Sequence, residues 1–353
     1  MSTNVTSNVS TTVAGSTQTA ANIAGYTIIF IISLIGNLII SIITVQKKTG
    51  RTPIDILIFA LAICDLVITV SIPFMAVSAL DPFFPFGLAG CKLLFGLRNV
   101  AIYSSAFILL VISLERYYST FDLSRSRRDL RITIGFIAIS VIIAFGLTIP
   151  QFTILNLVAN GNDSLHCLEV WNEDSRVGRK VYSTILIVLT FAIPFITITV
   201  SNVAICYKLF YAKSKSTANQ MRLKAKRQVV TVMIAVSAIF FICLLPIYLI
   251  NTLADFQAIA YTQPVLVATY VFTWIAYSHS MWNPIIYIIG SSNMRKSCKT
   301  LLKIDRHDSS IHNKNGRNIN STQGLKMIGK VMSNNKITPS QNATPAHELM
   351  SVK

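Results

Sequence analysis

The chain has 353 residues, of which 52% are hydrophobic and only 13% charged, and its formal net charge is +17. Since soluble domains carry about 25% charged residues, this composition favours the membrane class over a soluble globular domain. The charge does not indicate a nucleic-acid partner, because basic residues that alternate with apolar runs are the positive-inside signature of a membrane protein. Four polar segments hold 26 of the 31 lysines and arginines: 47–52, 116–131, 208–227 and 290–353.

The N-terminal segment 1–23 is rich in Ser, Thr, Asn and Ala, and Asn4 and Asn8 begin Asn-x-Ser/Thr acceptors for glycosylation outside the cell. It lacks the basic and apolar regions of a cleavable signal peptide. We therefore expect the first apolar run, 24–46, to act as a signal anchor. The positive charges in 47–52 are expected to hold the far end of that run in the cytoplasm.

Six more apolar runs of membrane-spanning length follow the first. They occupy 54–80, 92–117, 131–153, 181–207, 228–254 and 264–289. The sequence thus predicts an all-α membrane protein, a seven-transmembrane helix bundle over 24–290, with its N-terminus extracellular and its C-terminus cytoplasmic. In this topology the outer loop 154–180 places a third glycosylation acceptor, Asn162, outside the cell. Prolines are expected to kink five of the spans, at Pro73, Pro150, Pro194, Pro246 and Pro284.

Two segments follow the bundle. Residues 291–302 are basic and predict a short amphipathic eighth helix at the membrane surface. Residues 303–353 are polar and poor in aromatic side chains, which predicts a disordered cytoplasmic tail. Cys298, which lies between Lys296 and Lys299, is either palmitoylated or a free cytosolic thiol.

The six cysteines form no Cys-x-x-Cys pair and no cluster with histidine, which argues against a zinc site. Only Cys91 and Cys167 flank segments that we place outside the cell, where a disulfide persists. The sequence therefore predicts a Cys91–Cys167 bridge, with two free thiols as the alternative.

Ionisable groups inside the membrane are costly, so each one is a candidate for function. Asp65 lies in the middle of the second span, and other polar residues fall at comparable depths. Together they predict either a site for water or Na⁺, with Asp65 as the metal ligand, or a structural polar network that holds the helices together. The members of this predicted network are Asn37, Asp65, Ser105, His279, Ser280 and Asn283.

The third span is predicted to lie in the middle of the bundle. Arg98, Ser105, Leu109 and Arg116 recur on it at helical spacing and share one face. A face with an arginine near one end and Glu115-Arg116 near the other does not suit lipid.

The motifs of this chain resemble those of the rhodopsin-like (class A) G-protein-coupled receptors across residues 24–302. They are Gly36-Asn37, Leu61-Ala62-x-x-Asp65, Cys91, Glu115-Arg116-Tyr117, Phe191-x-x-Pro194, Phe240-x-x-Cys243-x-x-Pro246, Asn283-Pro284-x-x-Tyr287 and the basic run 294–302.

The resemblance implies a plasma-membrane receptor that couples an extracellular ligand to a heterotrimeric G protein. Glu115 is then expected to hold Arg116 in the inactive state, and outward movement of the sixth span would free Arg116 for the G protein. Phosphorylated Ser and Thr residues of the tail would bind an arrestin-type protein. The residues assigned to coupling and activation are Glu115, Arg116, Tyr117, Phe240, Leu244, Pro246, Asn283, Pro284 and Tyr287.

The chain also departs from the family's pattern. Leu244 stands where the family usually has Trp, Asn202 where it usually has Tyr, and Met294 where Phe is common. An aliphatic side chain at 244 cannot supply the usual ring contact below the ligand. A seven-helix binding protein that no longer signals therefore remains an alternative. A transporter or channel that uses Asp65 is a second, although no internal repeat is visible. No catalytic motif indicates an enzyme.

Two features narrow the ligand class. Arg98 stands where the family's amine receptors carry Asp, which argues against a biogenic amine. The seventh span also lacks the lysine to which the opsins link retinal. A buried guanidinium needs carboxylate or carbonyl oxygens, from the ligand or from the protein. The outer segments carry a mildly acidic rim, which favours a neuropeptide with basic residues; a non-peptide ligand with an acidic group is the alternative. The acids of this rim are Asp81, Asp163, Glu169, Glu173, Asp174 and Asp255. The predicted ligand-binding residues are Arg98, Asn99, Ile102, Gln151, Tyr248, Asn251, Thr273 and Tyr277.

Overall fold

The structure, a computed structural model, describes residues 3–47, 50–80, 84–121, 130–159, 165–171, 176–212, 216–260 and 262–301. Its elements are α1 (Thr3–Gln46), α2 (Pro53–Leu80), α3 (Gly87–Phe121), α4 (Leu130–Ile154), β1 (Leu155–Ala159), β2 (Leu165–Glu169), α5 (Arg176–Leu186), η2 (Ile187–Ala192), α6 (Ile193–Tyr211), α7 (Thr217–Asp255), α8 (Gln263–Gly290) and α9 (Ser292–Leu301). The segments α5, η2 and α6 together form the fifth long helix, so α7 is the sixth and α8 the seventh.

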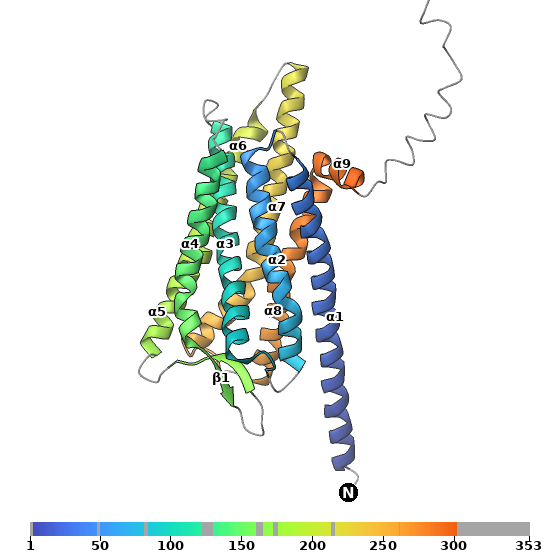
Figure 1. Cartoon of the computed structure of the whole chain (residues 1–353), viewed down its shortest axis with the longest axis vertical. Helices are drawn as coiled ribbons and strands as arrows, with labels where there is room; N and C mark the ends of the chain where they lie inside the picture. Colours follow the sequence, from blue (N-terminus) through green and yellow to red (C-terminus); the bar gives the residue numbers. More distant parts are fainter. Residues whose placement is uncertain are drawn as a thin grey trace, which may run out of the picture. The chain divides into compact units, whose positions relative to one another are not determined.

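The long helices pack side by side as a bundle (Figure 1). Helix α1 packs against α2 and α8, and α7 packs against α6 and α8. Helix α3 contacts α2, α4, α6 and α7, which is the central position expected from its two-ended polar face. The bundle arrangement thus agrees with the prediction from the sequence.

Six helical segments are long and apolar enough to cross a membrane: Ile23–Gln46, Pro53–Val77, Gly87–Phe121, Leu130–Ile154, Val177–Tyr211 and Asn219–Asp255. Helix α8, with 28 residues, is also long enough, but its buried face carries polar residues such as His279 and Asn283. These residues lower its apolar content while its partners in the bundle shelter them. With α8 the described part of the chain contains a seven-helix bundle.

Burial in the bundle follows what a lipid solvent requires. Large apolar side chains face outward, for example Ile142 at 68% and Val200 at 64% exposed. Several polar side chains are fully buried instead, among them Asn37, Asp65 and Ser105. Since lipid cannot satisfy hydrogen-bonding groups, polar side chains must find partners inside the bundle.

Most helix boundaries lie within five residues of the predicted spans, but α7 begins at Thr217, 11 residues before the predicted start at 228. Two further differences concern α1 and the loop after α4. Helix α1 begins at Thr3, so helical backbone extends through most of the segment 1–23, although its apolar part begins only at Ile23. The loop 154–180 contains a hairpin in which β1 pairs with β2 in antiparallel register, and the sequence analysis did not anticipate it. Helix α9 occupies most of the predicted amphipathic segment.

The fifth long helix contains a π-helical turn that was also not predicted. The N–H of Ile193 donates to the carbonyl of Val188, five residues earlier, where η2 passes into α6. Pro194 follows directly and has no N–H to give to the carbonyl of Thr190. A proline that removes one helical bond explains why the ladder changes its register at this point. The other four predicted prolines lie inside α2, α4, α7 and α8.

Some predictions fall outside the described residues. Asn162 and the tail from 302 onward are among them, and of Asn4 and Asn8 only the backbone is described. Glycosylation of these three asparagines and disorder of the tail stay predictions.

Candidate functional site

The hairpin is fixed to one end of the bundle, here called the hairpin end. The Cys91–Cys167 disulfide joins the start of α3 to β2, with their Cα atoms 5.6 Å apart, which confirms the predicted bridge. Across the hairpin, Leu157 is paired with Cys167. The N–H of Phe84, ahead of α3, donates to the Leu165 carbonyl at 2.7 Å. These three connections hold β2 close to the first turns of α3.

Arg98 lies two turns below the disulfide on α3 and is half-buried. Its Nη1 donates to the hydroxyl of Tyr277 on α8 at 2.9 Å, and its Nε donates to Asn99 Oδ1 at 3.1 Å. The ring of Phe95 lies 4.9 Å from the guanidinium carbon. All of these partners are neutral. Within the described part of the chain the Arg98 cation therefore has no carboxylate partner, and the protein itself supplies part of its hydrogen bonding.

A chain of hydrogen bonds continues from Arg98 to the hairpin. Asn99 Nδ2 donates to Gln151 Oε1 at 2.6 Å, and Gln151 Nε2 donates to Glu169 Oε1 at 2.8 Å. The other carboxylate oxygen of Glu169 accepts a bond from the Trp171 indole at 3.3 Å. Hydrogen bonds thus connect four side chains from α3, α4 and β2 in one chain. The Arg98 cation lies at one end of this chain and the exposed Glu169 carboxylate at the other.

The remaining predicted pocket residues divide into two groups. Tyr248 contacts Thr190 through its hydroxyl at 3.0 Å, and Ile102 and Tyr248 both pack against the main apolar core. Thr273 donates to the Thr269 carbonyl of its own helix, and Asn251 is exposed. The structure therefore brings Arg98, Asn99, Gln151 and Tyr277 into one hydrogen-bonded group, and it does not connect Thr273 or Asn251 to that group.

Sequence reasoning missed Glu169 as a pocket residue and counted it only as part of the acidic rim. The available signal was its position two residues after Cys167, because a disulfide to the start of α3 holds both residues near that helix. Tyr26 on α1 was also missed. Its ring packs edge-on against Trp274 and Tyr277, with centroids 6.0 and 6.1 Å apart. Nothing in the local sequence marks that contact.

The predicted polar network lies deeper in the bundle, where Asn283 Nδ2 on α8 donates to Asp65 Oδ2 on α2 at 2.7 Å. Asn37 on α1 donates to the Ser280 carbonyl at 3.0 Å. Ser33 adds a bond to Ser280 Oγ at 3.0 Å, so three helices are joined. The sequence analysis did not name Ser33, although its spacing of four residues before Asn37 places both on one face of α1.

Several atoms of this network have no hydrogen-bond partner in the described part of the chain. They are buried and include Asp65 Oδ1, Asn37 Oδ1 and Ser105 Oγ. His279 Nε2 also lacks a partner and lies 3.8 Å from Asp65 Oδ1, beyond hydrogen-bonding distance. One carboxylate oxygen near neutral amide and hydroxyl oxygens suits a hard monovalent cation or water. Among the described residues, no three His, Cys, Asp or Glu side chains lie close enough together to form a metal cluster.

At the opposite end of α3, Glu115 is buried, with 9% of its surface exposed, and Arg116 Nε has no hydrogen-bond partner among the described residues. Tyr117 stacks on Phe121 with ring centroids 4.6 Å apart. On α8 the hydroxyl of Tyr287 is likewise buried without a partner in the described ranges. Arg116 and Tyr287, which are both expected to change partners on activation, thus each have one buried polar atom without a hydrogen bond among the described residues.

The core below the pocket shows how the substitution at 244 is accommodated. Leu244 on α7 is buried, with 3% of its surface exposed. Phe240, one turn away, packs its ring edge-on against His279, with centroids 5.3 Å apart. Ring contact between α7 and α8 is therefore made at 240 rather than at 244. Pro246 lies inside α7, and Pro284 inside α8.

Comparison with known proteins agrees with this architecture. Residues 36–287 match the family described as 7 transmembrane receptor (rhodopsin family). Neuropeptide FF receptor 1 of Rattus norvegicus is 27% identical over 296 residues, which cover 78% of this chain and 68% of that protein. Neuropeptides B/W receptor type 2 of Homo sapiens is 27% identical over 284 residues, covering 79% and 85%. Somatostatin receptor type 1 of Rattus norvegicus is 25% identical over 289 residues, covering 78% and 70%.

The family match spans most of the chain and includes the helices that carry Asn37, Asp65, Arg116, Asn283 and Tyr287. It accounts for the seven-helix bundle. It also removes the enzyme, transporter and channel classes, because the family consists of receptors. The chain is a multi-pass membrane protein and belongs to the rhodopsin family of seven-transmembrane receptors.

Proposed function

We propose that this chain is a plasma-membrane receptor that binds an extracellular peptide at its hairpin end and signals to heterotrimeric G proteins from the opposite end. Its similarity to peptide receptors supports the ligand class, because the relatives described above are named as receptors for neuropeptides and for somatostatin. The positive-inside distribution of Lys and Arg supports the orientation, with the hairpin end outside the cell.

One observation carries the choice of a peptide. Arg98 and Glu169 are opposite charges at the two ends of one hydrogen-bonded chain, and neither has an ionic partner among the described residues. A peptide can satisfy both, because its carboxyl terminus or amide carbonyls suit a guanidinium and a basic side chain suits an exposed carboxylate. The rim acids Asp81, Asp163, Glu173 and Asp174 lie outside the described residues.

The proposed mechanism is a shift between two packings of the bundle. The peptide would favour the packing in which α7 moves away from α3 at the end opposite the hairpin. Arg116 and Tyr287, whose unpaired atoms are buried in the described structure, would then take new partners, Arg116 on the G protein and Tyr287 within the bundle. Asn283 would repack with Tyr287, since both lie on the same stretch of α8.

A sodium ion is proposed as an allosteric ligand of the polar network. Asp65, Asn37 and Ser105 would hold it, because each has a buried oxygen without a partner in the described part of the chain. The ion would supply the positive charge that a buried carboxylate otherwise lacks. His279 bounds the same space on the α8 side.

The remaining proposals concern the end opposite the hairpin. Cys298 is partly exposed on α9, where its thiol is accessible for palmitoylation. The Ser and Thr residues proposed to recruit an arrestin-type protein when phosphorylated lie in the tail, outside the described residues.

The function is tested by a second-messenger assay in transfected cells, screened against amidated and free-acid neuropeptides. Wild-type receptor is compared with Arg98→Ala, Glu169→Gln and Arg116→Ala at matched surface expression. We expect at least one peptide to give a response that Arg98→Ala and Glu169→Gln shift to higher concentration. We expect Arg116→Ala to remain silent while it still binds that peptide.

Two other outcomes of this assay would support the alternative functions. A response to small carboxylic acids, lost in Arg98→Ala and unchanged in Glu169→Gln, would replace the peptide by a non-peptide acidic ligand. Peptide binding without any second-messenger change in wild-type receptor would indicate a binding protein that no longer signals.

A further inference from the structure

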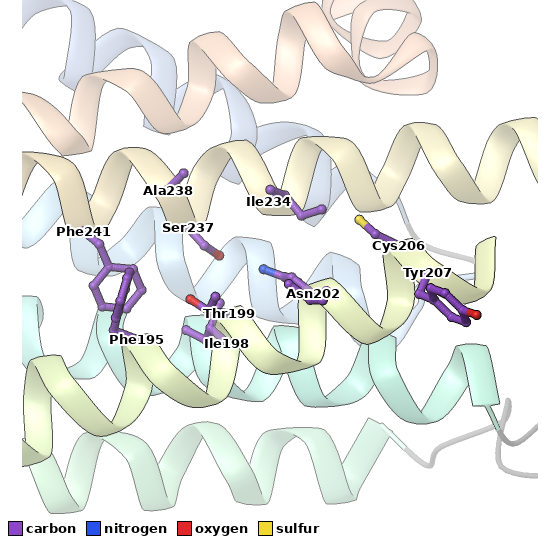
Figure 2. Close-up of a pocket in the computed structure, with 11 residues that line it drawn as sticks. Phe195, Ile198, Thr199, Asn202, Cys206, Tyr207, Ile234, Ser237, Ala238 and Phe241 are labelled. Atoms are coloured by element: carbon purple, nitrogen blue, oxygen red, sulfur yellow. The ribbon is translucent and has the colours of Figure 1, made fainter. Parts of the chain in front are cut away.

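A groove of about 470 Å³ lies between α6 and α7, away from the pocket at the hairpin end. Phe195 and Phe241 bound it on one side, with ring centroids 5.1 Å apart. Cys206 and Tyr207 line the opposite side, toward the end of α6 (Figure 2). Its volume falls in the range of about 300–1,000 Å³ that ligand pockets in proteins occupy.

Three polar side chains face one another in the middle of this otherwise apolar groove. In Figure 2 the amide of Asn202, the hydroxyl of Thr199 and the hydroxyl of Ser237 point into the same space. Asn202 Oδ1 accepts a long bond from Ser113 Oγ at 3.5 Å. In the described structure the Asn202 Nδ2 group and the Ser237 hydroxyl donate to no protein atom, although Ser237 is only 5% exposed.

The open side of the groove faces the surroundings of the bundle. Val203 and Tyr207 are 64% and 68% exposed. Both lie in a segment, Val177–Tyr211, that is long and apolar enough to cross a membrane. The molecules able to enter from that side are therefore those dissolved in the bilayer.

Unsatisfied donors at this position are costly, because hydrocarbon offers them no acceptor. An acyl chain alone would pack against the apolar walls of the groove but would leave the donors of Asn202 and Ser237 without an acceptor. A charged group would be expensive to bring to this depth. The chemistry that fits is an uncharged oxygen on an apolar body.

We propose that this groove binds a bilayer-soluble, uncharged molecule with an apolar body and one hydroxyl or carbonyl oxygen. The apolar body lies against Phe195, Phe241 and Tyr207, and the oxygen accepts from Asn202 Nδ2. Asn202 stands where the family usually has tyrosine, and the smaller side chain leaves both the space and the donor. The groove lies between the two helices α6 and α7, so its occupant contacts both.

The chain contains a built-in control for this proposal. A second groove of about 430 Å³ lies along α7 and α8, lined by Leu245, Leu249, Leu253 and Phe272 among others. It has similar size, but its described lining contains no hydrogen-bonding side chain. Non-specific partitioning of an apolar molecule would label both grooves alike.

The test uses 3-azi-1-octanol, a photoactivatable alcohol, on full-length receptor in phosphatidylcholine vesicles. Labelled residues are mapped by mass spectrometry after irradiation, with and without excess 1-octanol. We expect saturable labelling of 195–207 and 234–241 that octanol displaces, and only linear, undisplaced labelling around Leu249. Loss of one hydrogen bond is expected to weaken labelling roughly fivefold in Asn202→Leu.

Four further variants keep the result interpretable. Thr199→Val and Ser237→Ala should each reduce labelling of the groove, while Thr184→Val, an exposed position on α5 outside it, should leave labelling unchanged. Asn202→Tyr should abolish it, because the ring fills the space. Equal, non-saturable labelling of both grooves, or labelling unaffected by Asn202→Leu and by Ser237→Ala, overturns the proposal.

Discussion

Arg179 and Asp255 form an ion pair that joins α5 to α7, with Arg179 Nη2 2.5 Å from Asp255 Oδ1. Ser183, one turn further along α5, also donates to the Asp255 carboxylate. Asp255 is the last residue of α7, so the contact ties the end of the helix proposed to move in signalling. It also removes Asp255 from the acids free to receive a basic ligand side chain.

This ion pair should contribute measurably to stability. The Arg179 and Asp255 side chains are 36% and 13% exposed, so solvent screens the pair in part. We expect a coupling of about 1 kcal/mol in a double-mutant cycle of Arg179→Ala and Asp255→Asn. Thermal unfolding of detergent-solubilised receptor measures it. The more exposed Lys47–Asp55 pair is the control and should give a smaller coupling. Strictly additive effects of Arg179→Ala and Asp255→Asn would contradict this role.

The contact between α1 and α8 should tolerate no side chain at Gly36. A Cβ atom there would lie 2.5 Å from the Pro284 ring, which is rigid and cannot move aside. Gly36→Ala is therefore expected to destabilise the receptor by about 1–3 kcal/mol, with less protein at the cell surface. Gly135→Ala is the matched control, because a Cβ at Gly135 meets nothing within 4 Å. Equal surface expression and equal thermal stability of the two variants would rule out this packing argument.

Arg116 should be required for coupling and not for folding. Its Nε is buried without a partner in the described ranges, so removing the side chain breaks no hydrogen bond at that atom. Arg116→Ala is expected to reach the cell surface in normal amount and to give no second-messenger response. Surface labelling and the signalling assay in the same cells check both halves. A normal response from this variant would sink the proposed mechanism.

The sequence was most informative where the membrane restricts the choices. A bilayer requires long apolar helices and polar residues turned inward, so the seven spans and the Asp65–Asn283 neighbourhood could be predicted from apolar length and motif spacing. The Cys91–Cys167 bridge followed from which cysteines flank outer segments. These features depend on local composition and on topology, both of which can be read along the chain.

The contacts that the sequence could not provide depend on packing between distant segments. The Gln151–Glu169 bond needs the position of the hairpin relative to α4, which no local pattern in the sequence specifies. Asn251 was predicted from helical depth alone, but depth does not specify the direction of a side chain, and Asn251 is exposed. Glu169 was assigned to the rim because its place in an outer loop does not specify which side chains it contacts.

The polar network should make receptor stability depend on the identity of the salt. If sodium binds at Asp65, a concentration ten times its dissociation constant stabilises the folded receptor by about 1.4 kcal/mol, a rise of several degrees in the unfolding temperature. We expect ligand-free wild-type receptor to unfold at higher temperature in NaCl than in choline chloride at equal ionic strength. Asp65→Asn should remove that difference, because the neutral amide no longer attracts the cation.

The same helix supplies the control for this measurement. Asp55→Asn also removes one carboxylate from α2, but Asp55 pairs with Lys47 at 2.6 Å, far along the helix from Asp65. It should therefore keep the full difference between the two salts. Identical unfolding temperatures of wild-type receptor in both salts would assign the unpaired atoms Asp65 Oδ1 and Ser105 Oγ to water. A difference that persists in Asp65→Asn would place the sodium effect elsewhere on the protein, since the carboxylate of the polar network would no longer be present.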